Sequence, residues 1–447
     1  MTSLDDPITD VLGTSLLDTA YANDRAHVFH SWSAQAALNP TVIAGALGCR
    51  MWDHQGKTYL DFSSQLVNVN IGHQHPKMIA AIKAQADRLC TVAPSMANDM
   101  RSEAARLIVE RAPGDLDMVF FTNGGAEAIE NAIRMAKIHT GRMKVLSMYR
   151  SYHGSTSGAI SLTGEARRHD SEPGMPGAIK FFGPYLYRSV FHAMTEAEEC
   201  ERALKHLRDV VVGEGTDRVA AIVLETVPGT NGILVPPDGY LAGVRALCDE
   251  FGMIMICDEV MAGFGRCGEW FAVNHWGVAP DLITFAKGVN SGYVPLGGVV
   301  ISRQIADTFR DRVYQGGLTY SGHPLACAAA VASINIFEDE GIIEHARTLG
   351  DDVFGPALRS MAERHDVIGE VRGLGVFWAV EFVTDRASRT PVSAATMAAL
   401  ATACKQRGLW PFIAANRLHV VPPCVISVDE AHEGLAIIDE AIADMTA

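Results

Sequence analysis

Short apolar runs recur through the middle of this sequence, with helix-like patterns between them. The runs are MVFFT (118–122), KVLSM (144–148), VAAIVLE (219–225), MIMIC (253–257), LITFA (282–286) and GGVVIS (297–302). Their apolar character is continuous rather than alternating, as is typical of strands that are covered on both faces. Strands that alternate with helices favour a parallel sheet joined by crossover helices. We therefore expect an α/β fold.

One of the intervening segments carries a clear helix pattern. In HQHPKMIAAIKAQADRL (73–89), Pro76 suits the first position of a helix. Ile79, Ile82, Ala86 and Leu89 recur at helical spacing and predict one apolar stripe along it.

The two ends of the chain follow the repeating pattern less closely. At 447 residues the chain exceeds the size at which a single core usually keeps growing, so a large domain with a smaller companion is expected. Both ends contain strand and helix segments of their own, such as GVFWAVEFV (375–383). We expect 71–334 to form the large domain, and 1–70 and 335–447 to form the small domain together.

The composition restricts the kinds of partner. The 37 Lys and Arg against 52 Asp and Glu give a formal charge of -15, which argues against a broad nucleic-acid or anionic-membrane surface. The nine cysteines include no CxxC pair, so neither a disulfide framework nor a metal site such as zinc is indicated. The N-terminal MTSLDDPITD lacks the features of a signal peptide, and no apolar run approaches the ~20 residues of a membrane span. We expect a soluble cytoplasmic protein that binds small molecules.

Polar residues follow the apolar runs at the points where the expected strands end. VAAIVLE ends in Glu225, MIMIC is followed by Asp258, and LITFA is followed by Lys287, while Tyr152 and His153 lie shortly after KVLSM. Each alone has a plain structural reading as a solvated strand end, a helix cap or a packed loop residue. In a parallel α/β sheet, however, ligands bind outside the carboxyl ends of the strands. Together these residues predict a site at that edge.

A glycine turn follows the run MVFFT. In FTNGGAEAIENA (121–132), Gly124 and Gly125 lead into a helix whose first N–H groups would be free to bind an anion such as phosphate. The segment is neither a P-loop nor a dinucleotide fingerprint. Glu127 and Glu130 would oppose a phosphate unless they point away.

Taken in order, these segments resemble the class III aminotransferases, which are pyridoxal 5'-phosphate (PLP) enzymes of fold type I. The likeness spans residues 25–440 and rests on FTNGGAEAIENA, YHG (152–154), ETVPGTNGI, ICDEVMAGFGRCG, TFAKGVNSGYVPLGG and TYSGHPLACAAA. SWSAQ, FSSQLVNVNIGHQHP and NRLHVVPP carry a narrower likeness to omega-amino-acid aminotransferases, especially those for taurine. The resemblance implies a three-layer αβα large domain with a mixed, mostly parallel sheet and a small α+β domain.

The resemblance also implies a role for each polar residue. Lys287 would bind the cofactor aldehyde covalently, because an amine in a partly desolvated site can be neutral and nucleophilic near pH 7. Asp258 would pair with the pyridine nitrogen and keep it protonated. Tyr152 and Val260 would pack on opposite faces of the ring. The remaining cofactor residues would be Gly124, Gly125 and Ala126 at the phosphate, His153 and Glu225 near the ring, and Thr319 of TYSGHP at the phosphate of the neighbouring subunit. The active unit would therefore be a homodimer or a dimer of dimers.

Substrate residues are less constrained. Gamma-aminobutyrate aminotransferases carry a second Glu where this chain has Thr230, so their Glu–Arg switch is not expected here. Some amine:pyruvate enzymes carry an Arg near the position of Phe412, and Arg417 is the nearest cation in this chain. A remote sulfonate or carboxylate needs a cation, for which a guanidinium is well suited. Arg417, Trp32 and Val67 are the expected substrate residues, although Arg417 as a salt-bridged surface residue is an equal alternative.

The sequence thus predicts an aminotransferase that moves an amino group from an omega-amino acid, with taurine or β-alanine favoured, to pyruvate or 2-oxoglutarate. One alternative keeps the cofactor and changes the reaction, as in the related aminomutases and decarboxylases. Another is a catalytically silent binding or regulatory protein on the same scaffold. Intact Asp258, Lys287 and phosphate loop argue against the second.

Overall fold

The computed structural model of the chain describes residues 16–446, and the acidic segment 1–10 considered above lies outside them. A seven-stranded sheet occupies the centre of the fold, in the order β4-β10-β9-β8-β7-β5-β6. β10 is antiparallel to both of its neighbours, and the other strands run parallel to one another. The strands are β4 (Leu116–Thr122), β5 (Lys144–Met148), β6 (Ala178–Phe181), β7 (Val219–Glu225), β8 (Ile254–Asp258), β9 (Leu282–Phe285) and β10 (Gly297–Ser302).

All six predicted strands of this sheet are present. The prediction missed only β6, the edge strand beside β5, whose four residues AIKF are too short and too mixed to stand out. The mixed, mostly parallel α/β sheet confirms the expected fold class.

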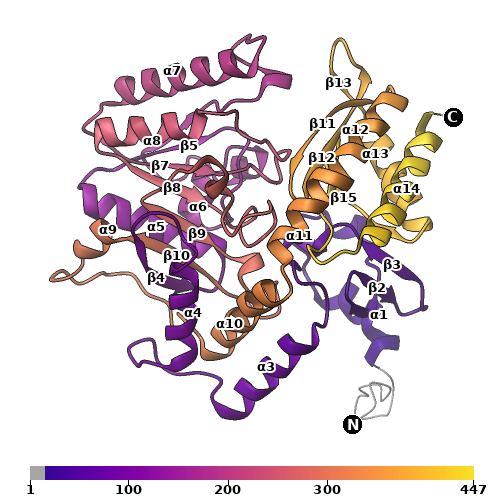
Figure 1. The fold of residues 1–447 in the computed structure, drawn as a ribbon, viewed down its shortest axis with the longest axis horizontal. Helices are drawn as coiled ribbons and strands as arrows, with labels where there is room; N and C mark the ends of the chain where they lie inside the picture. Colours follow the sequence, from indigo (N-terminus) through magenta and orange to yellow (C-terminus); the bar gives the residue numbers. More distant parts are fainter. Residues whose placement is uncertain (1–15, 447) are drawn as a thin grey trace.

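Helices cover both faces of the sheet, which explains the continuous apolar runs. One face packs against α5 (Gly125–Thr140), whose Ile129, Ala132 and Ile133 are buried against sheet residues such as Val223 and Ile256. The other face packs against helices that include α4 (Asp99–Val109), α7 (Glu196–Glu214), α8 (Tyr240–Phe251) and α10 (Pro324–Asp339). The result is three layers, with α7 and α8 along one side in Figure 1.

Helix α3 (Pro76–Arg88) begins at Pro76 as predicted, but its buried face is different from the predicted stripe. Met78 and Gln85 are buried, whereas Ala86 and Leu89 are exposed and Ile82 packs only partly against the core. Apolar side chains are thus left on the surface of the single chain.

The two chain ends lie side by side, as Figure 1 shows by the nearness of β2 and β3 to α14. Strand β3 pairs in parallel with β14 in the sheet β1-β2-β3-β14, and a second sheet has the order β11-β12-β16-β15, with β13 beside β12. We propose that the border between the two domains lies between residues 70 and 71 and again between residues 334 and 335. The strands are β1 (Ile43–Leu47), β2 (Arg50–Asp53), β3 (Thr58–Asp61), β11 (Ile368–Leu374), β12 (Phe377–Asp385), β13 (Thr390–Pro391), β14 (Leu409–Trp410), β15 (Phe412–Ala414) and β16 (Arg417–Val420).

The remaining helices complete the two parts of the chain. They are α1 (Leu16–His27), α2 (Ser64–Val67), α6 (Ser157–Leu162), α9 (Arg303–Asp307), α11 (Ile342–Thr348), α12 (Gly355–Arg364), α13 (Ala394–Gln406) and α14 (Val428–Thr446). Among the described residues 16–446, no helix combines the length and apolarity that crossing a membrane requires.

Arg266 joins the large sheet region to both chain ends. It is fully buried, and its guanidinium donates to the carbonyl oxygens of Val376 at 3.0 Å and Pro422 at 2.5 Å. It also donates to Ser64 Oγ at 3.1 Å and Asn70 Oδ1 at 2.7 Å. These four acceptors offset much of the cost of burying the guanidinium, whose Nε has no hydrogen-bond partner among the described residues, so Arg266 links the two parts.

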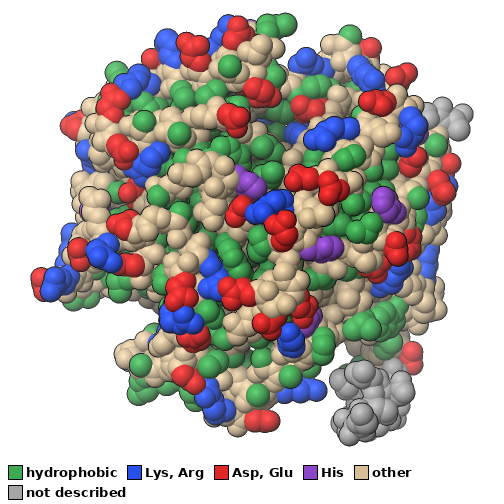
Figure 2. All heavy atoms as spheres, in the orientation of Figure 1, with side chains coloured by type: hydrophobic (Ala, Val, Ile, Leu, Met, Phe, Trp, Pro, Cys, Tyr) green, Lys and Arg blue, Asp and Glu red, His purple; other side chains and the backbone are tan. Residues whose placement is uncertain are grey.

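The surface carries charges of both signs. On the face drawn in Figure 2, Lys and Arg side chains are interspersed with Asp and Glu rather than gathered into one broad basic area. This agrees with the formal charge of -15.

Candidate active site

A cavity of about 290 Å³ lies beyond the carboxyl ends of β7, β8 and β9. It brings together eight residues predicted from the sequence. The lining consists of Gly125, Ala126, Tyr152, His153, Gly154, Ser155, Glu225, Thr230, Asp258, Val260, Met261 and Lys287.

The N-terminus of α5 forms one wall of this cavity. Gly124 is extended and precedes the helix, and a Cβ on Gly125 would lie 2.8 Å from Val260 Cγ2, which explains why this position holds glycine. Glu127 turns back to accept the N–H of Asn123 at 2.8 Å, and Glu130 accepts the N–H of Gly158 at 2.6 Å. Both carboxylates are therefore engaged elsewhere, and the first N–H groups of α5 can bind an anion.

Asp258 ends β8 and is buried. Its Oδ1 accepts the N–H of Val260 at 3.0 Å, and its Oδ2 lies 2.7 Å from His153 Nδ1. His153 is also buried, and its Nε2 has no hydrogen-bond partner among the described residues. The imidazole and the backbone thus fix the carboxylate in one orientation at the cavity.

Glu225 ends β7 and is held by two backbone donors. Its Oε1 accepts the N–H of Tyr152 at 2.8 Å, and its Oε2 accepts the N–H of Gly229 at 2.9 Å. Burial raises the pKa of Glu225 to about 7, against the opposing effects of His153 and these backbone donors. Glu225 therefore orders the loops that follow β5 and β7.

Lys287 follows β9 directly and has a φ of 44°, in the left-handed region. Such a conformation is uncommon for a residue other than glycine and is found preferentially at functional sites. Burial lowers the pKa of Lys287 to about 8, with the carboxylates of Glu225 and Asp258 opposing it and the charge of Arg167 adding to it. An appreciable share of this amine is therefore neutral near pH 7.

Arg167 is a cation at this site that the sequence analysis missed. Its Cζ lies 3.7 Å from the centroid of the Tyr152 ring, and its Nε pairs with Glu165. Its Nη2 is buried without a hydrogen-bond partner in the described part of the chain. No periodic apolar pattern marks it in the sequence, because it lies in a short 3₁₀ helix, Ala166–Ser171, between β5 and β6.

Five predicted residues do not line the cavity of the single chain, and one of them, Gly124, immediately precedes the lining residue Gly125. Trp32 and Thr319 are exposed, and Trp32 has 63% of its surface accessible. Val67 is buried behind the cavity in a cluster that includes Met261. Arg417 is half-buried, and its Nη2 lies 3.5 Å from the carbonyl oxygen of Thr230, a residue that does line the cavity.

Arg417 is not the salt-bridged surface residue that the sequence left as an alternative. Within residues 16–446 it forms no ion pair, and its Nε is buried without a hydrogen-bond partner. Burial lowers the pKa of Arg417, with Glu381 opposing the shift. Thr230 presents only its backbone oxygen and hydroxyl, so the carboxylate partner known from gamma-aminobutyrate aminotransferases is absent at this position.

Comparison with known proteins identifies the family. The profile described as "Aminotransferase class-III" matches residues 32–442. The chain belongs to the class III aminotransferases. A taurine-pyruvate aminotransferase of Bilophila wadsworthia is 32% identical over 403 residues, which cover 87% of each chain. A 4-aminobutyrate aminotransferase of Escherichia coli is 34% identical over 414 residues, which cover 90% of this chain and 93% of the relative.

The solved structures include similar enzymes. A taurine:2-oxoglutarate aminotransferase from Bifidobacterium kashiwanohense, in complex with PLP and glutamate, superimposes with a TM-score of 0.93 at 40% identity and covers 98% of both chains. As a class III aminotransferase, this chain is a PLP-dependent enzyme of fold type I. The residues present fit the cofactor, since the cavity offers free helix N–H groups, a buried carboxylate and a partly neutral lysine.

Proposed function

We propose that this aminotransferase takes its amino group from an omega-amino acid, with taurine or β-alanine favoured, and delivers it to pyruvate or 2-oxoglutarate. The observation that carries the proposal is the Arg167 guanidinium over the Tyr152 ring at the cavity, with one N–H group buried and unpaired. The guanidinium already pairs with Glu165 through Nε, but its unpaired Nη2 can still donate to an acid group, and a guanidinium binds a planar or trigonal acid group well. The likeness to two taurine aminotransferases supports the same substrate class.

Within this proposal the cofactor residues have the roles expected from the family. PLP, when bound, supplies the electron sink that makes the substrate carbon acidic. Lys287 would be its covalent anchor and would then move a proton between the substrate carbon and the cofactor carbon. Asp258 would pair with the ring nitrogen, and Tyr152 and Val260 would pack on its two faces. The other residues that would hold the phosphate and the ring are Gly124, Gly125, Ala126, His153 and Glu225.

Arg167 and Arg417 contact two different residues of the cavity lining, Tyr152 and Thr230, so they can serve different acid groups. Arg167 stands over Tyr152, and Arg417 reaches the loop at Thr230. We assign Arg167 to the sulfonate or carboxylate of the donor, and Arg417 to the acid group of whichever substrate extends toward Thr230.

We predict that Arg167→Ala or Arg417→Ala weakens taurine, β-alanine or the keto-acid acceptor by a factor equivalent to ~2–3 kcal/mol. An uncharged donor such as 1-phenylethylamine should be nearly unaffected in its own half reaction, because it offers no acid group to pair. Steady-state kcat/KM for the acids and single-turnover rates for the amine measure the difference.

Arg168→Ala is the matched control for this prediction. Arg168 is the next residue along the chain, but it pairs with Glu172 at 2.9 Å and lines a different cavity. It should leave the ratio of charged to uncharged donors unchanged. Equal losses for both donors in the Arg167 and Arg417 variants would show that these arginines are structural.

The main alternative function keeps PLP and changes the reaction to an aminomutase or decarboxylase reaction. The two are separated by supplying a labelled amino donor with an added keto acid. Labelled nitrogen on the keto acid without release of carbon dioxide supports transamination. Carbon dioxide release, or rearrangement of the donor without an acceptor, would contradict it.

We further propose that the active unit is a homodimer or a dimer of dimers. Apolar side chains are exposed on the single chain at Leu89 and Met96, and 60% of the Tyr320 surface is accessible beside Thr319. Covering these groups would supply an apolar interface. Thr319 would then reach the cofactor phosphate of the neighbouring subunit.

Mixing inactive Lys287→Ala chains with Thr319→Ala chains is predicted to restore part of the activity. Some hybrid sites then carry neither substitution, because the two residues of one site come from different chains. Activity after mixing and subunit exchange, compared with each variant alone, measures this. A fully active, cofactor-saturated monomer would refute the shared site.

A further inference from the structure

The nearest acidic neighbour of Arg417 by strand register is Glu381. The two residues are directly opposite each other in the antiparallel pair of β12 and β16. Side chains at such positions point to the same face of the sheet and lie close enough to interact. A half-buried Arg and a buried Glu placed in this way would ordinarily form an ion pair, yet none joins them in residues 16–446.

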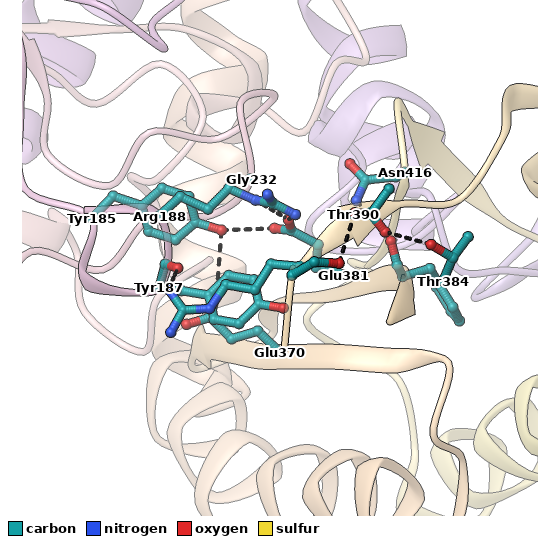
Figure 3. Close-up of polar contacts among 12 residues, drawn as sticks. Tyr185, Tyr187, Arg188, Gly232, Glu370, Glu381, Thr384, Thr390 and Asn416 are labelled. Atoms are coloured by element: carbon teal, nitrogen blue, oxygen red, sulfur yellow. Dashed lines mark hydrogen bonds and ion pairs between the residues drawn. The ribbon is translucent and has the colours of Figure 1, made fainter. Parts of the chain in front are cut away.

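Glu381 is instead occupied by other donors. Its Oε1 accepts from Arg188 Nε at 2.6 Å, while its Oε2 accepts from the Tyr185 hydroxyl at 2.7 Å and from Arg372 Nη2 at 2.8 Å. Figure 3 shows Glu381 and Glu370 meeting Tyr185 and Arg188, which come from the other part of the chain. The Glu381 side chain is only 1% exposed, so these contacts replace water.

Arg372 is the residue that connects this network to the cavity loop. Its Nε donates to the carbonyl oxygen of Gly232 at 2.6 Å, and its Nη1 pairs with Glu370. An ideal Cβ on Gly232 would lie 2.7 Å from Arg372 Nη2 and 3.3 Å from Arg417 Cδ. Arg372 and Arg417 therefore pack against the same loop, the one that carries Thr230 into the cavity wall.

The charges of the group favour this division of partners. Among residues 16–446, Arg188, Arg372 and Arg417 lie near Glu370 and Glu381, and Arg150 lies over the Tyr185 ring, so guanidinium groups outnumber carboxylates and Arg417 is left without one. Burial would raise the pKa of Glu381, but Arg372, Tyr185 and Arg188 together lower it to about 2, so it is ionised throughout the working pH range. An ionised Glu381 released from its donors would compete for Arg417.

We propose that Arg372 is a positioning residue that, with Arg188 and Tyr185, holds Glu381 away from Arg417 and so keeps Arg417 free for the acid group of the substrate. This rests on the proposed role of Arg417. The network then determines specificity for acids without touching the substrate, because an internal carboxylate and the substrate acid are alternative partners of one guanidinium.

The test replaces Arg372 and then removes the competitor. Arg372→Gln should raise KM for taurine or 2-oxoglutarate about tenfold, the effect of a competing ion pair of modest strength, with kcat little changed. The half reaction with 1-phenylethylamine should keep its wild-type rate. Adding Glu381→Gln to Arg372→Gln should restore KM, because the competing carboxylate is gone.

Several outcomes separate the possible failures. A double variant with the same or a higher KM than Arg372→Gln, or equal losses for acids and 1-phenylethylamine, would overturn the positioning role while leaving the proposed function in place. If Arg417→Ala itself fails to discriminate acids from the uncharged amine, both the role of Arg417 and this inference fall. Arg372→Lys keeps a cation beside Glu381 and should show a smaller rise in KM than Arg372→Gln, and thermal melting checks that each variant is folded.

Discussion

Replacing Lys287 by alanine is expected to abolish transamination. Loss of general acid–base catalysis alone lowers turnover by ~10²–10⁴-fold, and the variant also loses the covalent anchor of the cofactor. The reason is positional, since Lys287 follows β9 in a left-handed conformation and lines the same cavity as Asp258 and Glu225. Steady-state activity of the variant, together with borohydride reduction and peptide mapping of the wild-type enzyme, tests this assignment. The label should be found on Lys287.

Lys180→Ala is a stringent control for Lys287→Ala. Burial lowers the pKa of Lys180 to about 7, so it is also an unusually neutral lysine. Its Nζ, however, donates to Ser147 Oγ at 2.8 Å and to the carbonyl oxygen of Ser161 at 2.6 Å, outside the cavity of Lys287. Its replacement should leave turnover close to wild type. A label on Lys180, or normal turnover in Lys287→Ala, would contradict the assignment.

The pKa of Lys287 adds a pH dependence to the same experiment. A pKa of about 8 leaves roughly a tenth of this amine neutral at pH 7, several hundredfold more than an ordinary lysine. Only the neutral form attacks the cofactor aldehyde. The rate at which the cofactor-free enzyme captures PLP should therefore rise as the pH increases to about 8 and then level off. A rise that continues toward pH 10.5 would mean that burial does not tune this lysine.

The convergence of the predicted cofactor residues on one cavity was predictable because it depends on where strands end. Glu225, Asp258 and Lys287 each follow a continuous apolar run, and parallel strands bring their carboxyl ends to one edge of the sheet. Strand boundaries and helix α5 were accessible for the same reason, since burial on both faces leaves a strong apolar signal.

The substrate side was only partly predictable, because its geometry depends on irregular segments and on tertiary contacts. Arg167 reaches Tyr152 from a short 3₁₀ helix that has no periodic apolar pattern. Arg417 was recognised as the nearest cation, but the sequence left open whether a nearby acid paired with it. The nearby acid, Glu381, accepts hydrogen bonds from Arg188 and Tyr185 instead, and both of these residues lie far from it in the sequence.

Helix α3 illustrates a different limit. The stripe Ile79, Ile82, Ala86 and Leu89 has the spacing of a core-facing helix, yet Met78 and Gln85 are the buried residues. Periodicity shows which side chains share a face, but it does not say whether that face meets the core of the same chain or another surface. The exposed side of α3 fits the proposal that a second subunit covers this region.

Asp258→Asn is expected to give the second large loss. Asparagine has nearly the same volume and can still accept the N–H of Val260, but it removes the negative charge that faces the cavity beside His153. If Asp258 pairs with the ring nitrogen, the loss of a charge-assisted hydrogen bond costs ~1.5–3 kcal/mol, a factor of roughly ten to a hundred and fifty. Both the affinity for PLP and kcat/KM should fall by about this factor.

Asp281→Asn provides the matched control, because Asp281 lies just before β9, at the amino end of the strand whose carboxyl end leads to the cavity. It also accepts a backbone N–H, from Met255 at 2.7 Å, and pairs with Arg245 at 2.7 Å. The same substitution there should lower thermal stability without changing PLP affinity, since the carboxylate is remote from the cavity. Asp258→Asn should show the reverse, with a loss of PLP affinity that exceeds its loss of stability. Equal effects of the two substitutions on PLP affinity would mean that Asp258 does not contact the cofactor directly and that another group pairs with the ring nitrogen.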